Sequence, residues 1–555
     1  MSGSIPELIL RLLEQRGIVG DEAIEEFFSP SLSALARPEE LPGVVEAAEV
    51  VLANDGRVVV FGDYDCDGVC ATAILVSCLR ALAGEKGREL IVPFLPKRLS
   101  EGYGMSDASV SRMLAEHPDV KLVITVDNGI NSVEQVAELK AKGIRVVITD
   151  HHLPGETLPA ADAIVNPKVS APARVNGLCG AGVAFLLANR LVGEARRRGL
   201  YSGPNVGGPL LILAGLATVT DIMPLVGHNR ILVSEALARF RQLAPIGLRE
   251  LLDRAAKTAA TKLTSKDFGF LIGPRINAAG RLASGMEALE LVLTGDREIA
   301  RECARIVDAY NVERKNIEQK MTEEALAKVV PDAFAQVIDL PGGHPGVAGI
   351  VAARVLEHLG ERVPVCVIAG GHGSARSPEG LNIRDAFESC KDLLSTYGGH
   401  AAAGGFAVRD GQVDAFRARL NDYCSTRVAA LDPADAEPRA DVWVEPAELT
   451  VDLAEWLGRM EPFGEGNPLP VFGMRDVIFV ESRPLGQDGR HLQATISPAA
   501  QRLRRADCLR AVWWNHGDLV EELRRDAFKP RTITFALELS DYGERHIELR
   551  LYSIR

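Results

Sequence analysis

The chain has 555 residues, of which 47% are hydrophobic and 25% are charged, and its formal net charge at pH 7 is -13. A chain of this length is too long for one hydrophobic core, so we expect roughly three to four domains. The ordinary composition excludes a mainly disordered or fibrous protein. The negative charge argues against a protein that coats nucleic acid nonspecifically, although it leaves room for a local basic groove.

The N-terminus and the apolar runs predict where the protein works. The start, MSGSIPELILRLLEQ, lacks a basic region followed by a long apolar segment and a cleavage site, so it predicts no secretory signal. The longest apolar run, Pro209–Val219, is shorter than the roughly 18 residues that a membrane span needs. Nine cysteines without a paired framework favour reduced thiols. We therefore expect a cytoplasmic protein that does not enter a membrane.

The first half of the chain predicts helices followed by an α/β domain. Residues 1–45 have helical apolar spacing and are predicted to form an N-terminal helical segment. From 46 to 295, short apolar strands alternate with helical segments such as 132–142, a pattern typical of a parallel sheet with helices on its faces. The runs Val58–Phe61 and Val146–Ile148 do not alternate with polar residues, so they suit strands buried on both faces.

The second half predicts a long helix, a smaller α/β domain and a β-rich domain. Residues 296–330 contain neither glycine nor proline, and Asp296 suits a helix cap, so one connecting helix is expected. A second α/β domain is predicted at 331–430, and Asp432–Pro438 (DPADAEP) is predicted to be a linker. From 440 to 555 the pattern favours a small β-barrel, with strands near 477–481, 509–514, 532–539 and 547–554.

Ionisable residues directly follow three of the buried strands. Asp63, Asp65 and Asp67 follow the first strand, Asp127 the second, and Asp150, His151 and His152 the third. Because ligands gather outside the carboxyl ends of parallel strands, these side chains are expected to share one crevice. So many negative charges are unfavourable together without cations. The pattern predicts a hydrolytic metal site, which makes 46–295 the candidate catalytic domain.

The donor chemistry indicates the kind of metal. Carboxylates with one or two imidazoles and no thiolate favour Mn²⁺ or Mg²⁺ over zinc. Two such cations close together activate a water and hold the attacking and leaving oxygens of a phosphoester in line. The predicted reaction is therefore phosphoester hydrolysis with two divalent cations as cofactors. Cys66, inside the acidic loop, is predicted to be an apolar filler rather than a ligand.

Four ordered motifs resemble those of the DHH phosphoesterase superfamily, namely GDYDCDG at 62–68, VDNG at 126–129, DHH at 150–152 and TVTDIMPL at 218–225. Further motifs are similar to those of its RecJ-type single-stranded-DNA exonucleases, namely RINAAGRL at 275–282, GSARS at 373–377, GGHAAAGG at 398–405 and EPFGEGNPLPVF at 461–472. Such ordered agreement is more specific than any single motif. The resemblance implies a DHH catalytic domain (46–295), a connecting helix (296–330), a DHHA1-like substrate-binding domain (331–430) and an OB-fold nucleic-acid-binding domain (440–555).

By position, the resemblance also implies the members of the metal site. The implied ligands of the metal pair are Asp65, Asp67, Asp127, His151 and Asp221, with His152 as a further catalytic residue and Asp63 and Asp150 as ligands or supports. A carboxylate such as Asp150 beside His151 fixes the tautomer of a metal-bound imidazole. Helix capping after the strand is the alternative role for Asp63 and Asp150. Without the resemblance, Asp221 would be assigned to a turn.

The resemblance further implies a pocket that grips the 5′ end of DNA. Arg281, Ser374 and Arg376 fall at the positions of this pocket, and Arg98 is a weaker candidate. Arginine suits the role because its planar fork donates two hydrogen bonds to one phosphate. His400 stands in a glycine-rich loop that permits close approach to a substrate, and a packing turn with an incidental histidine is the alternative.

Two tryptophans and one glycine complete the predicted features. On an alternating strand only one of Trp513 and Trp514 can face a groove, so neither is assigned a stacking role. Gly343 departs from the family pattern, in which an aromatic residue precedes His344.

The function that the resemblance implies is a processive 5′-to-3′ exonuclease that releases 5′-mononucleotides from single-stranded DNA in repair and recombination. A monomer is expected, with a helicase and a single-strand-binding protein as partners. One alternative is a DHH phosphodiesterase for short oligoribonucleotides, cyclic dinucleotides or pyrophosphate, which would have no need of a barrel. The other is a non-catalytic scaffold for replication proteins, which would have no need of clustered carboxylates.

Overall fold

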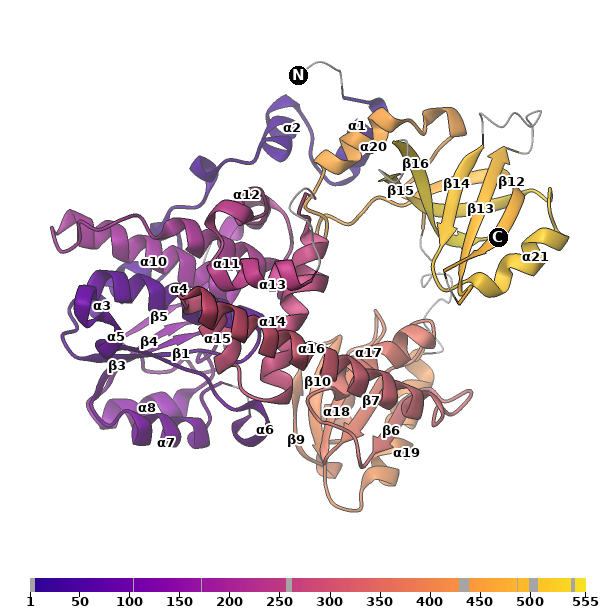
Figure 1. The fold of residues 1–555 in the computed structure, drawn as a ribbon. Coiled ribbons are helices and arrows are strands. Elements are labelled where there is room, and N and C mark those ends of the chain that lie inside the picture. The colour runs from indigo at the N-terminus through magenta and orange to yellow at the C-terminus, as the bar shows by residue number, and fades with distance from the viewer. Residues whose placement is uncertain are drawn as a thin grey trace. The chain divides into compact units, whose positions relative to one another are not determined.

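The computed structural model describes residues 5–102, 104–170, 172–255, 262–428, 439–486, 488–498, 508–540 and 545–555. The chain, drawn in Figure 1, divides into two compact units. The large unit comprises Ser31–Leu431 and Gly464–Gly466, and the small unit comprises Met1–Pro30, Asp432–Phe463 and Asn467–Arg555. The predicted linker Asp432–Pro438 lies outside the described residues, and the predicted domain boundaries remain predictions.

A five-stranded parallel sheet with the order β2-β1-β3-β4-β5 begins the large unit. Its strands are β1 (Arg57–Phe61), β2 (Ile91–Phe94), β3 (Val120–Val126), β4 (Arg145–Thr149) and β5 (Ala163–Val165). Val58 and Val60 of β1 share a core with residues of α4 (Cys66–Ala83) and α10 (Gly180–Arg197). Val59 and Phe61 share another core with residues of α7 (Asp107–Glu116) and α8 (Val133–Ala141). Both faces of β1 are therefore buried, as its unbroken apolar run predicted.

Helix α4 and the short turns after it, Cys66–Leu90, are long and apolar enough to cross a membrane by length and composition, with a mean hydropathy of 1.6. Polar residues such as Thr72 and Ser77 interrupt the segment, so a search for unbroken apolar runs misses it. In the structure 72% of its apolar window is buried inside the fold, and α10 and α11 (Gly207–Thr220) pack against it. A core helix has the same length and composition, so this segment is weak evidence for a membrane span.

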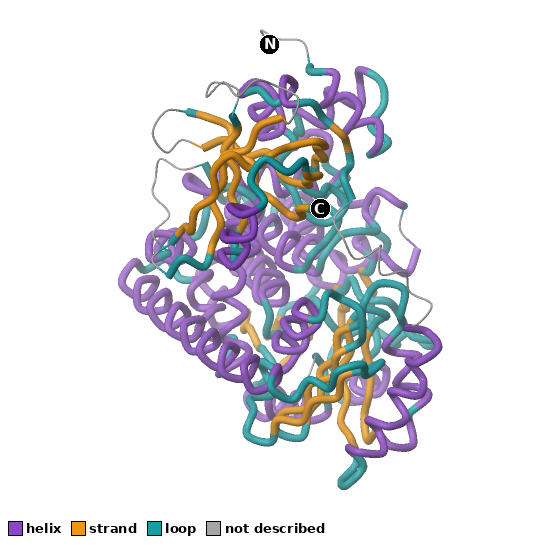
Figure 2. The backbone as a smooth tube through the Cα atoms, turned by 90° about the vertical axis from the view of Figure 1, so that its right-hand side faces the viewer, coloured by secondary structure: helices purple, strands orange, loops and turns teal. Residues whose placement is uncertain are grey.

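The remaining helices of the first half of the large unit surround this core. They are α3 (Val44–Leu52), α5 (Gly87–Leu90), α6 (Arg98–Glu101), α9 (Pro167–Ser170), α12 (Gly227–Leu243), α13 (Ile246–Arg254), the π-helix η5 (Asp267–Ile272), α14 (Gly273–Leu282) and α15 (Met286–Leu293). Figure 2 shows the helices of the described chain in purple and its strands in orange.

The predicted long helix is observed as α16 (Arg297–Leu326), which has 30 residues. The carboxylate of Asp296 accepts hydrogen bonds from the backbone N–H groups of Glu298 (2.8 Å) and Ile299 (3.2 Å). Asp296 therefore caps the helix as predicted, because it satisfies amides that have no partner inside the helix.

A second, mixed sheet follows α16, in agreement with the predicted smaller α/β fold. Its order is β6-β7-β8-β10-β9, from β6 (Gln336–Leu340), β7 (Val365–Ala369), β8 (His372–Arg376), β9 (Leu394–Gly399) and β10 (Ala403–Val408). β6 and β7 are parallel, and the other pairs are antiparallel. The helices of this part are α17 (Ala348–His358), which packs on β7 and β8, α18 (Ile383–Ser389) and α19 (Val413–Val428).

The small unit is built on a six-stranded sheet with the order β11-β12-β13-β14-β16-β15. Its strands are β11 (Val442–Trp443), β12 (Phe472–Leu485), β13 (His491–Pro498), β14 (Leu509–Trp513), β15 (Arg531–Ser540) and β16 (His546–Ile554). β12 also pairs with β15, so β12 to β16 form a continuous ring of pairings. Four of these strands match predicted ones, whereas β11 and β13 were not predicted.

Helices from both ends of the chain pack in the small unit. They are α1 (Glu7–Gln15), α2 (Asp21–Phe28), α20 (Val451–Arg459) and α21 (Val520–Arg525). Leu12 and Phe27 share one hydrophobic core with Trp456 and Phe472. Apolar burial of this kind joins the N-terminal residues to the small unit.

Candidate metal centre and phosphate pocket

The carboxyl ends of β1, β3 and β4 lie next to one another because these three parallel strands are neighbours in the sheet. The structure brings together the predicted acidic and imidazole side chains at this edge. Three groups of side chains hold ligand atoms within 4.8 Å of one another: Asp63, Asp65 and Asp127; Asp67, His151 and Asp221; and Asp127, His151 and His152. All predicted metal-site residues except Asp150 belong to at least one of these groups.

The imidazole of His151 lies at the middle of the cluster. Its Nε2 is 3.1 Å from Oδ1 of Asp127, 3.6 Å from Oδ2 of Asp221 and 3.7 Å from Oδ2 of Asp67. Asp127 follows β3 and His151 lies just after β4, whereas Asp221 lies at the C-terminal end of α11. Residues far apart in sequence therefore meet around one imidazole.

Backbone amides hold two of the aspartates. The carboxylate of Asp67 accepts hydrogen bonds from the N–H groups of Gly180 and Ala181, both at 2.7 Å, at the N-terminus of α10. Asp65 accepts from the N–H of Gly68 at 3.0 Å and so caps α4. These bonds fix the carboxylates with groups that a helix N-terminus leaves unsatisfied.

Asp150 supports the site in a way that differs from the prediction. Its Oδ1 accepts from Nδ1 of His152 at 2.7 Å and from the backbone N–H of His151 at 2.7 Å, and its Oδ2 accepts from the N–H of Ile130 at 3.0 Å. The imidazole that Asp150 orients is therefore that of His152, whereas we expected that of His151. The hydrogen bond between Nδ1 of His152 and Asp150 sets the orientation of this ring beside the cluster.

Burial and mutual repulsion govern the electrostatics of the cluster. Burial raises the pKa of Asp63 and Asp127 well above the usual range, and the charges of Asp65 and Asp67, respectively, raise each further. Burial and the charge of Asp67 raise the pKa of Asp221 to about 9. Burial also raises the pKa of Asp67, although His151 opposes this. Carboxyl groups with raised pKa values bind protons near neutral pH unless a cation replaces them.

The pKa values of His151, His152 and Asp150 depend on burial and on one hydrogen bond. Burial favours the neutral form of His151 and lowers its pKa. Burial opposes the charge of His152 as well, but the hydrogen bond to Asp150 outweighs it and raises the pKa of His152. Burial would raise the pKa of Asp150, yet the same hydrogen bond and that of Ile130 hold it below its usual value. A neutral His151 keeps a lone pair for a metal, while the hydrogen bond between Asp150 and His152 favours the charged form of both.

The donor set fits divalent cations. Oδ1 of Asp63 and Oδ2 of Asp221 are buried and accept no hydrogen bond within the described part of the chain. Buried carboxylate oxygens without partners are costly, and a cation would satisfy them. Carboxylates with one or two imidazoles match the preference of Mn²⁺ and Mg²⁺. Cys66 is buried and belongs to the hydrophobic core, as predicted.

A cavity of about 730 Å³ adjoins the acidic loop after β1, and Tyr64, Arg98 and Ser374 are among its lining residues. The guanidinium of Arg98 lies 4.9 Å from the ring centroid of Tyr64, the residue between Asp63 and Asp65. A cation over an aromatic ring gains electrostatic stabilisation. The acidic loop after β1 therefore contributes to the metal cluster with its aspartates and to the cavity with Tyr64.

The other predicted arginines, Arg281 and Arg376, are not among the residues that line this cavity, but they lie close to it. Arg281 donates through Nη1 to the carbonyl oxygen of Gly346 at 3.1 Å. A Cβ on Gly349, near the N-terminus of α17, would lie 3.3 Å from Nη2 of Arg376 and 3.5 Å from Oγ of Ser374. Burial, and next the charge of Arg98, lower the pKa of Arg281 to about 10 and also lower that of Arg376. Arginines and a hydroxyl near a helix N-terminus suit a phosphate group.

The structure does not bring the side chain of His400 into the cavity lining. His400 is exposed in the turn between β9 and β10, and it is not among the residues that line the cavity, whereas Gly398 and Gly405 of the same loop are. The glycines, rather than the imidazole, approach the cavity.

Two residues near the site were given no role in the sequence. Tyr64 lies within GDYDCDG, and Asn277 lies within RINAAGRL. Oδ1 of Asn277 accepts a hydrogen bond from the backbone N–H of Cys66 at 2.7 Å, so Asn277 ties α14 to the acidic loop. The helical spacing of Asn277 and Arg281, four residues apart, was the signal that they share one face.

Comparisons with known proteins agree with this geometry. The family model of the DHH family N-terminal domain matches residues 57–204, that of the DHHA1 domain matches 332–426, and that of the RecJ OB domain matches 440–552. The single-stranded-DNA-specific exonuclease RecJ of Dickeya dadantii is 37% identical over 521 residues, which are 89% of this chain and 87% of that protein. Its Escherichia coli counterpart is 35% identical over 528 residues, which are 90% and 88% of the two chains.

Solved structures give the same result. A crystal structure of RecJ from Thermus thermophilus in complex with Mn²⁺ matches with a TM-score of 0.80 at 33% identity, covering 100% of this chain and 78% of that one. A structure of the RecJ of the same organism in complex with Mg²⁺ matches with a TM-score of 0.72 at 30% identity. The chain belongs to the RecJ family.

Proposed function

We propose that this protein is a metal-dependent 5′-to-3′ exonuclease that hydrolyses single-stranded DNA to 5′-mononucleotides in DNA repair and recombination. The observation that carries the proposal is the position of the acidic loop after β1. Asp63 and Asp65 of this loop belong to the metal cluster, and Tyr64 between them lines the cavity that Arg98 and Ser374 share. A hydrolytic centre and a pocket for a terminal phosphate are therefore one residue apart.

The chain's own residues have separable roles in this proposal. Two divalent cations, Mn²⁺ or Mg²⁺, would be held by the clustered aspartates and His151, and when bound they would supply an activated water and neutralise charge on the phosphoester. The amides of Gly180 and Ala181 keep Asp67 oriented. The hydrogen bond with Asp150 fixes the ring of His152 and raises its pKa, which favours the form that can donate to an oxygen of the scissile phosphate.

The 5′-to-3′ polarity in this proposal rests on the resemblance to the RecJ-type exonucleases, in which this pocket grips the 5′ end. Arg281, Arg376 and Ser374 would hold the terminal phosphate, and the first phosphodiester would then lie at the metal cluster. A terminal phosphate at either end of a strand spans the same distance to its first phosphodiester, so the geometry sets the length of the product and the resemblance sets the polarity. Product release would free one 5′-mononucleotide in each cycle.

The two alternative functions, a phosphodiesterase for small substrates and a non-catalytic scaffold, leave parts of the chain without a role. A phosphodiesterase for short oligoribonucleotides or cyclic dinucleotides has no need of the RecJ OB domain matched at 440–552, since such domains track extended single strands. A scaffold without activity has no need of buried carboxylates with raised pKa values. A cytoplasmic location, a monomeric state, and a helicase and single-strand-binding protein as partners belong to the proposal as well.

The Asp127→Asn variant tests the proposed site. Asp127 has a φ of 61°, a left-handed conformation that asparagine tolerates and most residues do not, so this change removes charge without backbone strain. We expect Mn²⁺-dependent degradation of single-stranded DNA to fall by at least about 100-fold, while the thermal unfolding temperature stays within a few degrees. Asp55→Asn, at an exposed position before β1, is the matched control and should keep full activity. Full activity of Asp127→Asn would overturn the assigned centre.

Substrate comparison separates the alternatives. Single-stranded DNA blocked at its 5′ end should stay intact, whereas the same strand blocked at its 3′ end should be degraded to mononucleotides. Cleavage of short RNA or cyclic dinucleotides alone would favour the phosphodiesterase, and binding of replication proteins with no cleavage of any substrate would favour the scaffold.

A further inference from the structure

Helix α14 contacts both the loop of the metal cluster and the phosphate pocket. Near its middle, Oδ1 of Asn277 accepts a hydrogen bond from the backbone N–H of Cys66 at 2.7 Å. In its last turn, Arg281 donates to the carbonyl oxygen of Gly346 at 3.1 Å. Asn277 and Arg281 are four residues apart, so they lie on the same face of the helix. One face of α14 therefore holds the acidic loop and presents an arginine to the pocket.

The amide that Asn277 binds lies between two metal-site aspartates. Cys66 separates Asp65 from Asp67 in the sequence, and it is the first residue of α4. The N–H groups of the first turn of a helix have no partner inside the helix, so this amide needs an acceptor from elsewhere. Asn277 supplies that acceptor and fixes the backbone from which both carboxylates project. A shift of this amide would move both aspartates together.

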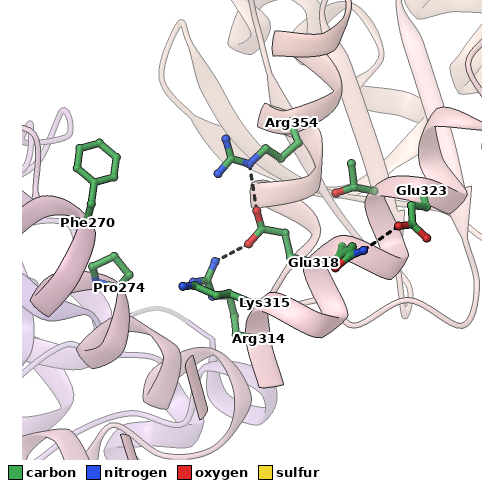
Figure 3. A pocket seen from close by; sticks show the side chains of 9 residues that line it. Phe270, Pro274, Arg314, Lys315, Glu318, Glu323 and Arg354 are labelled. Atoms are coloured by element: carbon green, nitrogen blue, oxygen red, sulfur yellow. Dashed lines mark hydrogen bonds and ion pairs between the residues drawn. The ribbon is translucent and has the colours of Figure 1, made fainter. Parts of the chain in front are cut away.

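The first turn of α14 is anchored on the long helix α16. Nε of Arg275 donates to Oδ1 of Asp308 on α16 at 2.9 Å. Pro274 lines a cavity of about 530 Å³ together with Arg314 and Glu318 of α16, which bond to each other (Figure 3). The start of α14 is therefore fixed, and the position of its other end depends on contacts with the acidic loop and the phosphate pocket.

The last turns of α14 pack closely against both of these. A Cβ on Gly280 would lie 2.3 Å from the carbonyl oxygen of Tyr64, and a Cβ on Gly346 would lie 2.4 Å from that of Arg281. Backbones this close move together, because a close-packed interior leaves no free volume between them. The position of Arg281 is therefore linked to that of the acidic loop.

Like charges surround the guanidinium of Arg281. Burial lowers the pKa of Arg281 to about 10, and three neighbouring arginines lower it further, against the charge of Asp65. The three are Arg98, Arg314 and Arg376. Repulsion among these cations opposes the close packing at the end of α14. A phosphate dianion would pair with the guanidinium groups and remove that repulsion, so it would favour the packed position of the helix.

We propose that Asn277 is a positioning residue through which a terminal phosphate at Arg281 places Asp65 and Asp67 for the metal pair. The inference rests on the proposed function and adds a coupling between its two sites. A ligand shifts a conformational equilibrium only by its differential affinity for the two states, and the pairing of the phosphate with the arginines supplies that difference. Cleavage is then fast only when the end of a strand occupies the pocket.

Kinetics on DNA dinucleotides test this role, because a dinucleotide allows only one cleavage. Dinucleotides with a 5′-phosphate and with a 5′-hydroxyl are compared, in the presence of Mn²⁺, for the unchanged protein and for Asn277→Ala. In the unchanged protein we expect the phosphate to lower KM and to raise kcat by about 3- to 10-fold, the factor that one hydrogen bond is worth. In Asn277→Ala the effect on kcat should fall below about twofold, whereas the effect on KM should remain, because the arginines of the pocket are intact.

Binding of Mn²⁺ gives a second measurement that does not depend on activity. In isothermal titration calorimetry Asn277→Ala should bind Mn²⁺ about 3- to 10-fold more weakly, because the backbone between the two aspartates is no longer held. Asn277→Asp keeps an acceptor oxygen and should restore the effect of the phosphate on kcat. Asn277→Ser has a side chain too short to reach the amide and should behave as Asn277→Ala does, which keeps the inference testable if the alanine variant does not fold.

Asn421→Ala is the matched structural control. Asn421, on α19, also accepts a hydrogen bond from a backbone N–H, that of Phe334 at 2.8 Å, and it donates to the carbonyl oxygen of Ala335 at 2.8 Å. This variant should lose stability but keep the effect of the phosphate on kcat and the affinity for Mn²⁺.

The outcomes separate this inference from the proposed function. An equal effect of the phosphate on kcat in Asn277→Ala and the unchanged protein would overturn the inference, and so would loss of the effect in Asn421→Ala as well. Absence of cleavage of any single-stranded DNA by the unchanged protein would overturn the proposed function instead. In that case the affinity for Mn²⁺ would still show whether Asn277 positions the two aspartates.

Discussion

At the scale of single residues, Asp221 illustrates what the sequence can and cannot reveal. It follows an apolar helix rather than a strand, so no strand-end pattern identifies it, and only the resemblance of TVTDIMPL assigned it to the metal site. The structure places its Oδ2 3.6 Å from Nε2 of His151 and buries that oxygen without a hydrogen bond in the described chain. Tyr64 and Asn277 were given no role for a related reason, because their contacts depend on the packing of elements that are distant in sequence.

The raised pKa of Asp221 leads to a pH-dependent stability. Its folded-state pKa of about 9 exceeds the ordinary value of 3.8, so the folded chain without cations binds this proton more tightly than the unfolded chain does. The corresponding stability is fully present below about pH 4 and is lost as pH rises through about 9. Without divalent cations, we therefore expect the thermal unfolding temperature to fall between about pH 6 and about pH 9, and saturating Mg²⁺ to raise it most at the upper end.

Asp221→Asn provides the control for this prediction. The variant has no titrating group at this position, so the fall in unfolding temperature over the same pH range should be smaller in the absence of cations. A Mg²⁺ stabilisation that is independent of pH in the unchanged protein would contradict the raised pKa.

At the scale of elements, the strands were the most predictable part. Unbroken apolar runs identified β1, β3 and β4, and the aspartates and histidines after them identified the edge where they meet. The amides that hold Asp67 belong to α10, more than a hundred residues away, and no local pattern links the two. The residues at the strand ends of this site can therefore be predicted from the sequence, because apolar runs reveal the strands. The helix N-terminus that binds them cannot be predicted, because no local pattern shows which helix packs there.

The close approach of α10 to β3 gives a prediction at this scale. A Cβ on Gly180 would lie only 2.6 Å from Cβ of Asp127, so Gly180→Ala must displace either the helix or the aspartate. We expect a loss of about 1–3 kcal/mol in the free energy of unfolding and a clear fall in nuclease activity. Denaturant unfolding and cleavage of single-stranded DNA are the measurements.

Gly193→Ala on the same helix is the matched control. Its Cβ would meet no atom within 4 Å, so the substitution should stabilise the helix by about 0.5–1 kcal/mol and leave activity unchanged. If both variants behaved alike, the contact between Gly180 and Asp127 would not be what sets the position of the aspartate.

At the scale of the whole molecule, the order of folds along the chain could be predicted, but the grouping of distant segments could not. Alternating strands and helices, the glycine-free helix and the late β-rich region each appear in the sequence at the right place. The packing of Leu12 and Phe27 with Trp456 and Phe472 joins residues more than four hundred positions apart, and nothing local indicates it. Likewise Gly464–Gly466 belong to the large unit, where the N–H of Leu225 donates to the carbonyl oxygen of Glu465 at 2.7 Å.

This division predicts what a fragment of residues 31–431 can do. Another solved RecJ structure bound to manganese matches 73% of this chain over its entire length, with a TM-score of 0.62 and 37% identity, so a chain of about this size folds in that relative. The fragment keeps every residue of the metal cluster and the phosphate pocket, and it loses the RecJ OB domain and the Leu225–Glu465 bond. Because stacking in an OB domain contributes about 1–3 kcal/mol per base, we expect affinity for a long strand to fall at least about tenfold, and cleavage of a dinucleotide to change less than about twofold. Fluorescence anisotropy measures the affinity and product analysis measures the cleavage, with Mn²⁺ binding as the check on folding.

A fragment that binds Mn²⁺ but loses affinity and dinucleotide cleavage to the same extent would contradict this prediction. It would mean that the small unit affects the metal centre itself rather than the binding of the strand.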